Sequence, residues 1–260
     1  MTPRTRSPDP SPLGPPAGPP SSAPKASSEN FPSLAHIATQ LSRSDPILAA
    51  LIHRQGLPGI PRGPRGFPAL AQSIIYQQIH GRAGDAIVRR IRARAGGRFP
   101  PPTWFAEASS TLLGEVGLSP QKKAYLKDLS TRILRGDLSL RTLCRRSDEE
   151  VIRALDEVHG IGRWTAQMYL IFSLRRPDVL PTGDLGIRKA LMKAYRLPKL
   201  PSETTVARRG EPWRPFRSYA TCLLWESLEE PTDVAGPRPL ERVPAPSRRD
   251  IEIRLPRKRR

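Results

Sequence analysis

One stretch of the sequence, residues 155–184, has the residue types and the spacing that chemistry on a polyanion needs. It holds two glycines one residue apart, Gly160 and Gly162, and a lone acid, Asp184, 22 positions beyond Gly162. Two glycines let the backbone bend sharply and approach a flat partner without Cβ clashes. A helix that starts at such a turn points free N–H groups and its positive dipole end outward, which suits a phosphate. The spacing predicts a DNA-backbone clamp followed by one positioned carboxylate.

The carboxylate of Asp184 has two interpretations. As a functional group it would be the one positioned carboxylate that follows the DNA-backbone clamp. As a structural group, Asp184 would cap the helix after the Pro-Thr-Gly turn. The two roles can coexist.

The charge balance also favours a nucleic-acid partner. The 260 residues include 43 Lys and Arg against 24 Asp and Glu, which gives a net charge of +19. Such a field attracts polyanions, although arginine-rich coding with solvated basic faces is the alternative. No apolar run approaches the length of a membrane span, and the N-terminus lacks the apolar centre of a signal peptide. We therefore expect a cytoplasmic, nucleoid-associated protein without membrane contact.

The cysteines exclude two classes of protein. Only Cys144 and Cys222 are present, far apart in the sequence. They cannot supply the four thiolates of an iron–sulfur cluster or the framework of a disulfide scaffold. Cys222 lies in an apolar run, so we expect it to be a buried thiol.

Composition divides the chain into three parts. Residues 1–30 contain nine prolines and almost no large aliphatic side chains, which predicts a disordered Pro-rich tail. Residues 231–260 end in RKRR and are predicted to form a disordered basic tail. That tail is either a nonspecific, salt-sensitive DNA anchor or a solvated extension. The domain between them, residues 31–230, is expected to be all-α.

Apolar residues recur at helical spacing through most of residues 31–230, while alternating strand patterns are nearly absent. A capping box, Ser147 to Glu150, predicts the start of the helix that leads into the glycine turn. The other expected helices are 34–42, 46–54, 68–95 (with Gly81 and Gly84 as potential breaks), 119–134, 162–174, 184–195, 202–209 and 215–228. The simplest interpretation is one domain of about eight to ten helices.

Four segments together resemble the helix-hairpin-helix (HhH-GPD) DNA glycosylases, in particular the 3-methyladenine DNA glycosylase II branch. The segments are SIIYQQIHGRA (73–83), VHGIGRWTA (158–166), PTGDLGIRKA (181–190) and WRPFRSYATCLLWE (213–226). The resemblance covers residues 32–230 and implies a multi-helix HhH-GPD fold in a base excision repair enzyme that flips its target base out of the duplex. Longer bacterial members carry an extra N-terminal α/β domain, and this chain resembles the compact members.

The resemblance assigns roles within the motifs. Asp184 matches the catalytic aspartate, which would stabilise the positive charge that develops on the sugar when the N-glycosidic bond breaks and could orient the attacking water. A base alkylated on a ring nitrogen is already cationic and leaves as a neutral molecule, so no general acid is needed. Family members that also cut the DNA strand carry a Schiff-base lysine where this chain has Trp164. An indole cannot act as that nucleophile, so the resemblance implies a monofunctional glycosylase that leaves an abasic site.

The resemblance also implies a pocket for the flipped base and a wedge for the space it leaves. The pocket residues are Trp164, Trp225, Met168 and Gln77. Flat aromatic walls would favour a cationic purine, whereas two ordinary core tryptophans are the alternative. Met168 stands where the family often has an aromatic residue. The wedge that enters from the minor groove is either Gln78 or His80, and the sequence leaves this choice open.

The hairpin is expected to bind the DNA backbone. By the resemblance, the phosphate ligands are Gly160, Gly162, Arg163 and Thr165. A structural Na⁺ or K⁺ would be bound by the backbone carbonyls of Asp156, Val158 and Gly160. His159 replaces the usual proline, which is expected to loosen the turn. No other cofactor is expected.

The resulting hypothesis is a monomeric DNA glycosylase that acts on double-stranded DNA containing alkylated bases. It would excise 3-methyladenine, and also 7-methylguanine, with Asp184 assisting hydrolysis. Two alternatives stay open: a glycosylase of the same fold for another damaged or deaminated base, and a noncatalytic helix-hairpin-helix DNA-binding protein. The cysteine count argues against an iron–sulfur mismatch adenine glycosylase.

Overall fold

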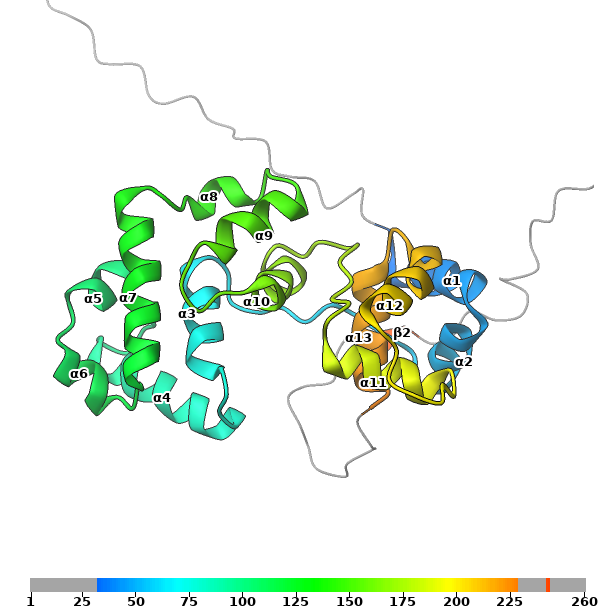
Figure 1. Cartoon of the computed structure of the whole chain (residues 1–260), viewed down its shortest axis with the longest axis horizontal. Coiled ribbons are helices and arrows are strands. Elements are labelled where there is room, and N and C mark those ends of the chain that lie inside the picture. Colours follow the sequence, from blue (N-terminus) through cyan, green and yellow to red (C-terminus); the bar gives the residue numbers. More distant parts are fainter. Residues whose placement is uncertain (1–31, 229–241, 244–260) are drawn as a thin grey trace, which may run out of the picture. The chain divides into compact units, whose positions relative to one another are not determined.

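The structure is a computed structural model that describes residues 32–228 and 242–243, to which all structural statements below refer. Within them the chain forms thirteen α-helices, one π-helical segment, one 3₁₀ segment and one pair of two-residue strands (Figure 1). The predicted all-α class is therefore confirmed. None of these helices has both the length and the apolar character that a membrane crossing requires. The predicted tail 1–30 lies outside the described residues.

A first set of helices comes from the two ends of the described chain. Its members are α1 (Leu34–Ser44), α2 (Pro46–Gln55), α11 (Leu185–Ala194), α12 (Glu203–Arg209), η3 (Glu211–Trp213) and α13 (Arg217–Glu226). Helix α13 is the centre of this set because it packs against α2, α11 and the first strand. Seven consecutive residues of α13, 218–224, are buried, as expected for a helix covered on all sides.

A second set of helices comes from the middle of the chain. Its members are α3 (Phe67–Tyr76), α4 (Gly81–Arg94), α5 (Pro102–Glu107), α6 (Ser110–Glu115), α7 (Pro120–Arg135), α8 (Leu140–Leu143), α9 (Asp148–Asp156), α10 (Arg163–Met168) and the π-helical η2 (Tyr169–Ser173). Helix α7 packs against α3, α5 and α6, and α9 packs against α10. The predicted capping box opens α9: the Ser147 N–H donates to Glu150 Oε2 (2.8 Å), and the Glu150 N–H donates to Ser147 Oγ (3.4 Å).

The predicted helix 68–95 is two helices, and the break comes just before Gly81. Helix α3 ends at Tyr76, and Gln78 adopts a left-handed backbone conformation with φ of +54°. Helix α4 then begins with His80 as its N-cap, because the His80 ring accepts the N–H of Arg82 (3.3 Å). Gly84, the other expected break, lies inside α4.

Other differences from the sequence prediction concern short segments. Helices α5, α6 and α8 have only four to six residues, which is too short to show a helical period. The predicted helix 162–174 is α-helical only to Met168 and then widens into the π-helical turn η2, four of whose five residues are buried. Such turns occur often at functional sites.

Two residues of the predicted C-terminal tail belong to the folded part. Strand β2 (Arg242–Val243) pairs antiparallel with β1 (Leu57–Pro58), with Leu57 opposite Val243. This differs from the disorder expected for residues 231–260. Composition misses such a pair because backbone N–H and C=O groups, rather than particular side chains, form it. The rest of that tail lies outside the described residues.

Candidate active site

Asp184 lies between two indole rings at the start of α11. Its Oδ1 accepts the N–H of Ile187 (2.7 Å) and the Nε1–H of Trp225 (2.9 Å). Its Oδ2 accepts the Nε1–H of Trp164 (2.7 Å). Donors from α10, α11 and α13 therefore fix both oxygens of one half-buried carboxylate. The capping role is present, and it leaves the carboxylate partly exposed.

The two tryptophans beside Asp184 are not core residues. Trp164 is 50% exposed, although it is one of the largest apolar side chains of the protein. Trp225 is half-buried, and its ring stacks on Phe172 with the centroids 6.0 Å apart and an interplanar angle of 23°. Trp213, by contrast, is completely buried. The alternative of two ordinary core tryptophans therefore does not describe Trp164 and Trp225.

A glycine next to the carboxylate makes this packing possible. A Cβ added at Gly186 would lie 2.9 Å from Asp184 Oδ1 and 3.1 Å from the Trp225 ring. Any side chain at this position would therefore displace the carboxylate or the indole. The glycine two residues after Asp184 is therefore required for a steric reason.

A pocket of about 240 Å³ lies between α3 and the α10–η2 segment, and we call it the α3–α10 pocket. This is below the ~300–1,000 Å³ of sites for drug-sized ligands, so it suits one small molecule. None of its lining residues is acidic or basic. The lining residues are Gly63, Pro64, Ala69, Leu70, Gln72, Ser73, Tyr76, Thr165, Met168, Tyr169, Phe172 and Ser173.

The α3–α10 pocket is connected to Asp184 through aromatic contacts. Phe172 lines the pocket and stacks on Trp225, which donates a hydrogen bond to Asp184. Met168 lines the pocket, whereas the two predicted pocket tryptophans, Trp164 and Trp225, do not line it. Sequence reasoning missed Phe172 and Tyr76. Phe172 follows Met168 by four positions, so helical spacing was an available signal for it.

Gln77 is placed differently from the prediction. It does not line the α3–α10 pocket. Its Nε2–H instead donates to the backbone carbonyl of Gly160 (2.7 Å), which lies in the hairpin. Gln77 is the C-cap of α3, and its extended ψ of 134° ends the helix there.

The two wedge candidates differ in how they are held. Gln78 has an exposed side chain at the left-handed residue of the turn between α3 and α4. A left-handed conformation is uncommon for a residue with a side chain and marks many functional turns. His80 is also exposed, but its ring is engaged as the N-cap of α4. The structure thus leaves Gln78 as the less restrained side chain.

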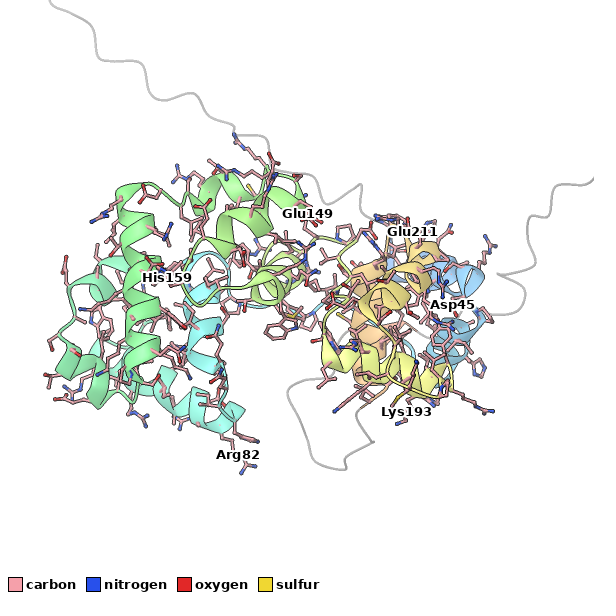
Figure 2. All side chains as sticks on the ribbon, in the orientation of Figure 1. Asp45, Arg82, Glu149, His159, Lys193 and Glu211 are labelled. Carbon is pink, nitrogen blue, oxygen red and sulfur yellow. The ribbon has the colours of Figure 1, made fainter. Side chains whose placement is uncertain are left out.

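The glycine hairpin is fixed by α7. Gly160 has φ of +84°, and a Cβ there would lie 2.1 Å from Tyr125 Cδ2, so only glycine fits. The N–H of His159 donates to Asp128 Oδ2 (2.9 Å), and the His159 ring lies beside the same oxygen (Nδ1, 3.2 Å; Figure 2). A proline has no N–H to donate. The expected loosening of the turn by His159 is therefore wrong: His159 attaches the turn to α7.

The surroundings of Asp128 favour its charged form. Burial raises the pKa of this carboxyl, but the His159 N–H and the charge and hydrogen bond of Arg132 together outweigh burial and hold the pKa below its usual range. Arg132 lies one helical turn away on α7, and its Nε is 3.2 Å from Asp128 Oδ2. The carboxylate of α7 that accepts the hairpin N–H is therefore charged at neutral pH.

The predicted phosphate ligands have different surroundings. Gly162 is the N-cap of α10, whose first turn offers backbone N–H groups. The Thr165 side chain is buried, so only its backbone lies in that turn. Arg163 forms a two-point ion pair with Glu149 (2.7 and 3.1 Å), in which both side chains are exposed. Figure 2 labels Glu149.

Two of the three carbonyls of the predicted cation site accept hydrogen bonds within the protein. The Val158 carbonyl accepts the N–H of Ile161 (3.0 Å), and the Gly160 carbonyl accepts the Gln77 amide (2.7 Å). Each carbonyl oxygen has a second lone pair, so the cation at this site stays a prediction.

The cysteines and other potential metal ligands are dispersed. Cys144 is exposed and Cys222 is buried, and both are free thiols. Burial, with a smaller effect of Glu226, raises the pKa of Cys222 to about 12, as expected of an inert core thiol. Within the part of the chain that the structure describes, no three His, Cys, Asp or Glu side chains come together as metal ligands.

These features define a class: an all-helical fold with a glycine hairpin and a partly exposed carboxylate held by indoles beside a small pocket. Residues 71–215 match the HhH-GPD superfamily base excision DNA repair protein family. The chain belongs to this superfamily.

Named relatives agree with this class. DNA-3-methyladenine glycosylase 1 of Schizosaccharomyces pombe is 35% identical over 163 residues, which cover 62% of this chain and 72% of the relative. The DNA-3-methyladenine glycosylase of Saccharomyces cerevisiae is 30% identical over 201 residues, covering 64% of this chain and 68% of the relative.

Solved structures share the fold. The S. pombe 3-methyladenine DNA glycosylase in complex with abasic DNA superposes with a TM-score of 0.67 at 32% identity, covering 73% of this chain and 95% of that one. The DNA-3-methyladenine glycosidase of Bacillus halodurans gives a TM-score of 0.68 at 29% identity, covering 74% and 88%.

Proposed function

We propose that this protein is a monofunctional DNA glycosylase that removes alkylated purines from double-stranded DNA and leaves an abasic site. The observation that carries the proposal is the Asp184 carboxylate, held by two indoles and partly exposed next to the α3–α10 pocket. The protein works as a cofactor-free monomer in the cytoplasm, in association with the nucleoid. Its relatives named DNA-3-methyladenine glycosylase support the substrate class.

DNA binding uses the hairpin as a backbone clamp. The first turn of α10, which Gly162 caps, presents N–H groups to a phosphate. The contacts of α7 with His159 and Gly160 hold the turn in one shape before DNA arrives. The net charge of +19 adds an attraction that depends on salt.

Base flipping uses the turn between α3 and α4. Gln78, exposed in its left-handed conformation, enters the space that the flipped base vacates and hydrogen-bonds to the unpaired base. His80 supports this turn as the cap of α4. The flipped base enters the α3–α10 pocket, whose aromatic side chains favour a flat cationic base.

The chemical step breaks the bond between C1′ and the base nitrogen. The bonding electrons go to the alkylated base, which loses its positive charge and leaves as a neutral molecule. The charge that develops on the sugar is stabilised by the Asp184 carboxylate, which Trp164 and Trp225 orient. Water then adds to C1′ and gives a proton to the carboxylate. Trp164 has no amine to form a Schiff base, so the strand stays intact.

The test is to incubate the full chain with methylated duplex DNA and to separate released bases and DNA strands chromatographically. We expect free 3-methyladenine, with 7-methylguanine more slowly, and strand breaks only after alkali treatment. No free methylated purine would overturn the proposed substrate class. Release of hypoxanthine from a duplex that contains deoxyinosine, without release of methylated purines, would favour a deaminated-base glycosylase. DNA binding without release of any base would favour a noncatalytic protein. Strand cleavage without alkali would overturn the monofunctional assignment.

A further inference from the structure

Tyr76 is an aromatic wall of the α3–α10 pocket, and the sequence assigned it no role within the segment 73–83. It is the last residue of α3, and it lines the pocket. Its ring also packs against α4 at Gly84, where an added Cβ would lie 2.4 Å from Tyr76 Cδ1. Since no side chain fits at position 84, the glycine allows the backbone of α4 to cover the ring and fix its position. This explains why Gly84 lies inside a helix, where it costs about 1 kcal/mol relative to alanine.

The hydroxyl group of Tyr76 is paired with a carboxylate outside the pocket. It donates a hydrogen bond to Asp85, the residue next to Gly84 on α4. Burial raises the pKa of Tyr76 to about 12, and the hydrogen bond and charge of Asp85 act in the same direction. Arg92 and Arg89 oppose this shift by smaller amounts. The tyrosine therefore remains a protonated donor at neutral pH.

A phenol that donates to a carboxylate is polarised toward the phenolate. Hydrogen bonds to an ionised partner are the strong ones, and they polarise the donor group. The electron density of the Tyr76 ring rises as a result, and the attraction of its face for a cation rises with it. Asp85 does not line the α3–α10 pocket itself, so its charge acts on the pocket through Tyr76.

We propose that Tyr76 and Asp85 are specificity-determining residues that make the α3–α10 pocket prefer a cationic purine over a neutral purine of the same shape. The pocket lining has no acidic side chain, so this pair supplies the negative potential that recognises the positive charge of an alkylated ring. The inference rests on the proposed function, because it assumes that the flipped base occupies this pocket. Asp85 is a positioning residue that acts through Tyr76.

In a merely structural role, Tyr76 and Asp85 would only hold α3 and α4 together across the turn 77–80. Removal of such a joint would weaken the fold or the binding of every base equally. A role in charge recognition changes the ratio between two ligands that differ only in charge. The ratio, measured on one protein sample, does not depend on how much of that sample is folded.

The experiment compares the affinity of the full chain for two duplexes. One carries 2′-fluoro-7-methylguanine, whose glycosidic bond is stabilised by the fluorine and whose base is cationic. The other carries 2′-fluoro-7-deaza-7-methylguanine, which has the same shape and is neutral. Wild type is compared with Tyr76→Phe, which removes the hydroxyl, and with Asp85→Asn, which removes the charge. Glu115→Gln is the matched control, because Glu115, on α6, forms an ion pair with Arg94 of α4 (3.0 Å), whereas the carboxylate that Tyr76 binds is Asp85.

We expect wild type and Glu115→Gln to prefer the cationic duplex equally. Both Tyr76→Phe and Asp85→Asn should lower this preference by about three- to ten-fold, the range of a partly desolvated cation–π contact. No preference in wild type, an unchanged ratio in both variants, or the same fall in Glu115→Gln would overturn the inference. Base release from methylated DNA is scored separately, so an unchanged ratio in an active glycosylase refutes this inference alone.

Discussion

Two aspartates of this protein have nearly the same hydrogen bonds and different surroundings. Asp184 caps α11 through Ile187 and accepts from two tryptophan indoles. Asp45 caps α2, because its Oδ1 accepts the N–H groups of Ile47 (2.8 Å) and Leu48 (3.2 Å). Figure 2 labels Asp45.

The other oxygen of Asp45 binds aromatic donors, as Asp184 does. Its Oδ2 accepts the Trp213 indole (3.0 Å) and the Tyr195 hydroxyl. Burial, followed by the hydrogen bond to Asp45, raises the pKa of Tyr195, so this hydroxyl stays a donor. A carboxylate that caps a helix and binds an indole is therefore not by itself a catalytic site.

Solvent exposure distinguishes the two aspartates. Asp45 is 9% exposed, and its partner Trp213 is completely buried, so Asp45 joins α1, α2 and η3 as a structural group. Asp184 is half-buried, its partner Trp164 is 50% exposed, and its partner Trp225 connects it to a pocket. Hydrogen bonds hold both carboxylates in place, and exposure to a substrate decides which of the two does chemistry.

Asp184→Asn should have the largest effect, a loss of at least about a hundred-fold in the rate of 3-methyladenine release, because the amide cannot stabilise the developing positive charge. The Asn side-chain oxygen can still cap α11, so the melting temperature should change little. Rates of base release and thermal melting of the same sample check both parts. Loss of activity together with unfolding would indicate that Asp184 is a structural group like Asp45, and would contradict the proposed difference between the two aspartates.

Asp45→Asn should have the opposite profile. Its new amide N–H groups would face the Trp213 or Tyr195 donors in a buried site, which should lower the free energy of unfolding by about 2–4 kcal/mol. None of the groups that Asp45 binds in the described structure belongs to the Asp184 site. The rate of base release per folded molecule should therefore stay near that of wild type. Urea unfolding measures the change in stability, and kinetics at a known folded fraction measure the rate.

The sequence allowed part of this comparison to be predicted. The hairpin, Asp184 and Trp164 lie within one stretch, so their types and spacing were readable as a local motif. The helix-capping role of Asp184 was also predicted, because capping depends on residues three positions apart.

The parts that were not predictable depend on contacts between distant segments. Asp128 binds the N–H of His159 across 31 positions, and Gln77 binds Gly160 across 83. Neither pair has a local signature, which is why His159 was expected to loosen the turn and Gln77 to line the pocket. Tyr76 belongs to the pocket only because α3 packs against η2, which a helical pattern in each segment does not reveal.

A third acid, Asp128, should give the smallest effect, and its signature is the pH dependence. Its pKa is lowered in the folded protein, so its contribution to stability is present above the unfolded pKa of about 4 and is lost as the pH falls through the folded value. Asp128→Asn should therefore be less stable than wild type by about 1 kcal/mol at pH 7, with the difference shrinking below about pH 4. Melting temperatures between pH 3 and pH 7 check this.

The exposed acid Asp137, just beyond α7, provides the matched control for that measurement. Asp137→Asn should follow wild type at each pH. A stability difference for Asp128→Asn that does not change with pH would contradict a stabilising role of the charged Asp128 carboxylate.

The most direct test of the role of Asp184 is one ratio: the single-turnover rate of 3-methyladenine release by Asp184→Asn divided by that of Asp45→Asn, each per folded molecule. Both changes replace an aspartate that caps a helix and binds an indole, so the ratio isolates the chemical role from the structural one. We expect a ratio of about one hundredth or less. A ratio near one would contradict Asp184 as the catalytic carboxylate.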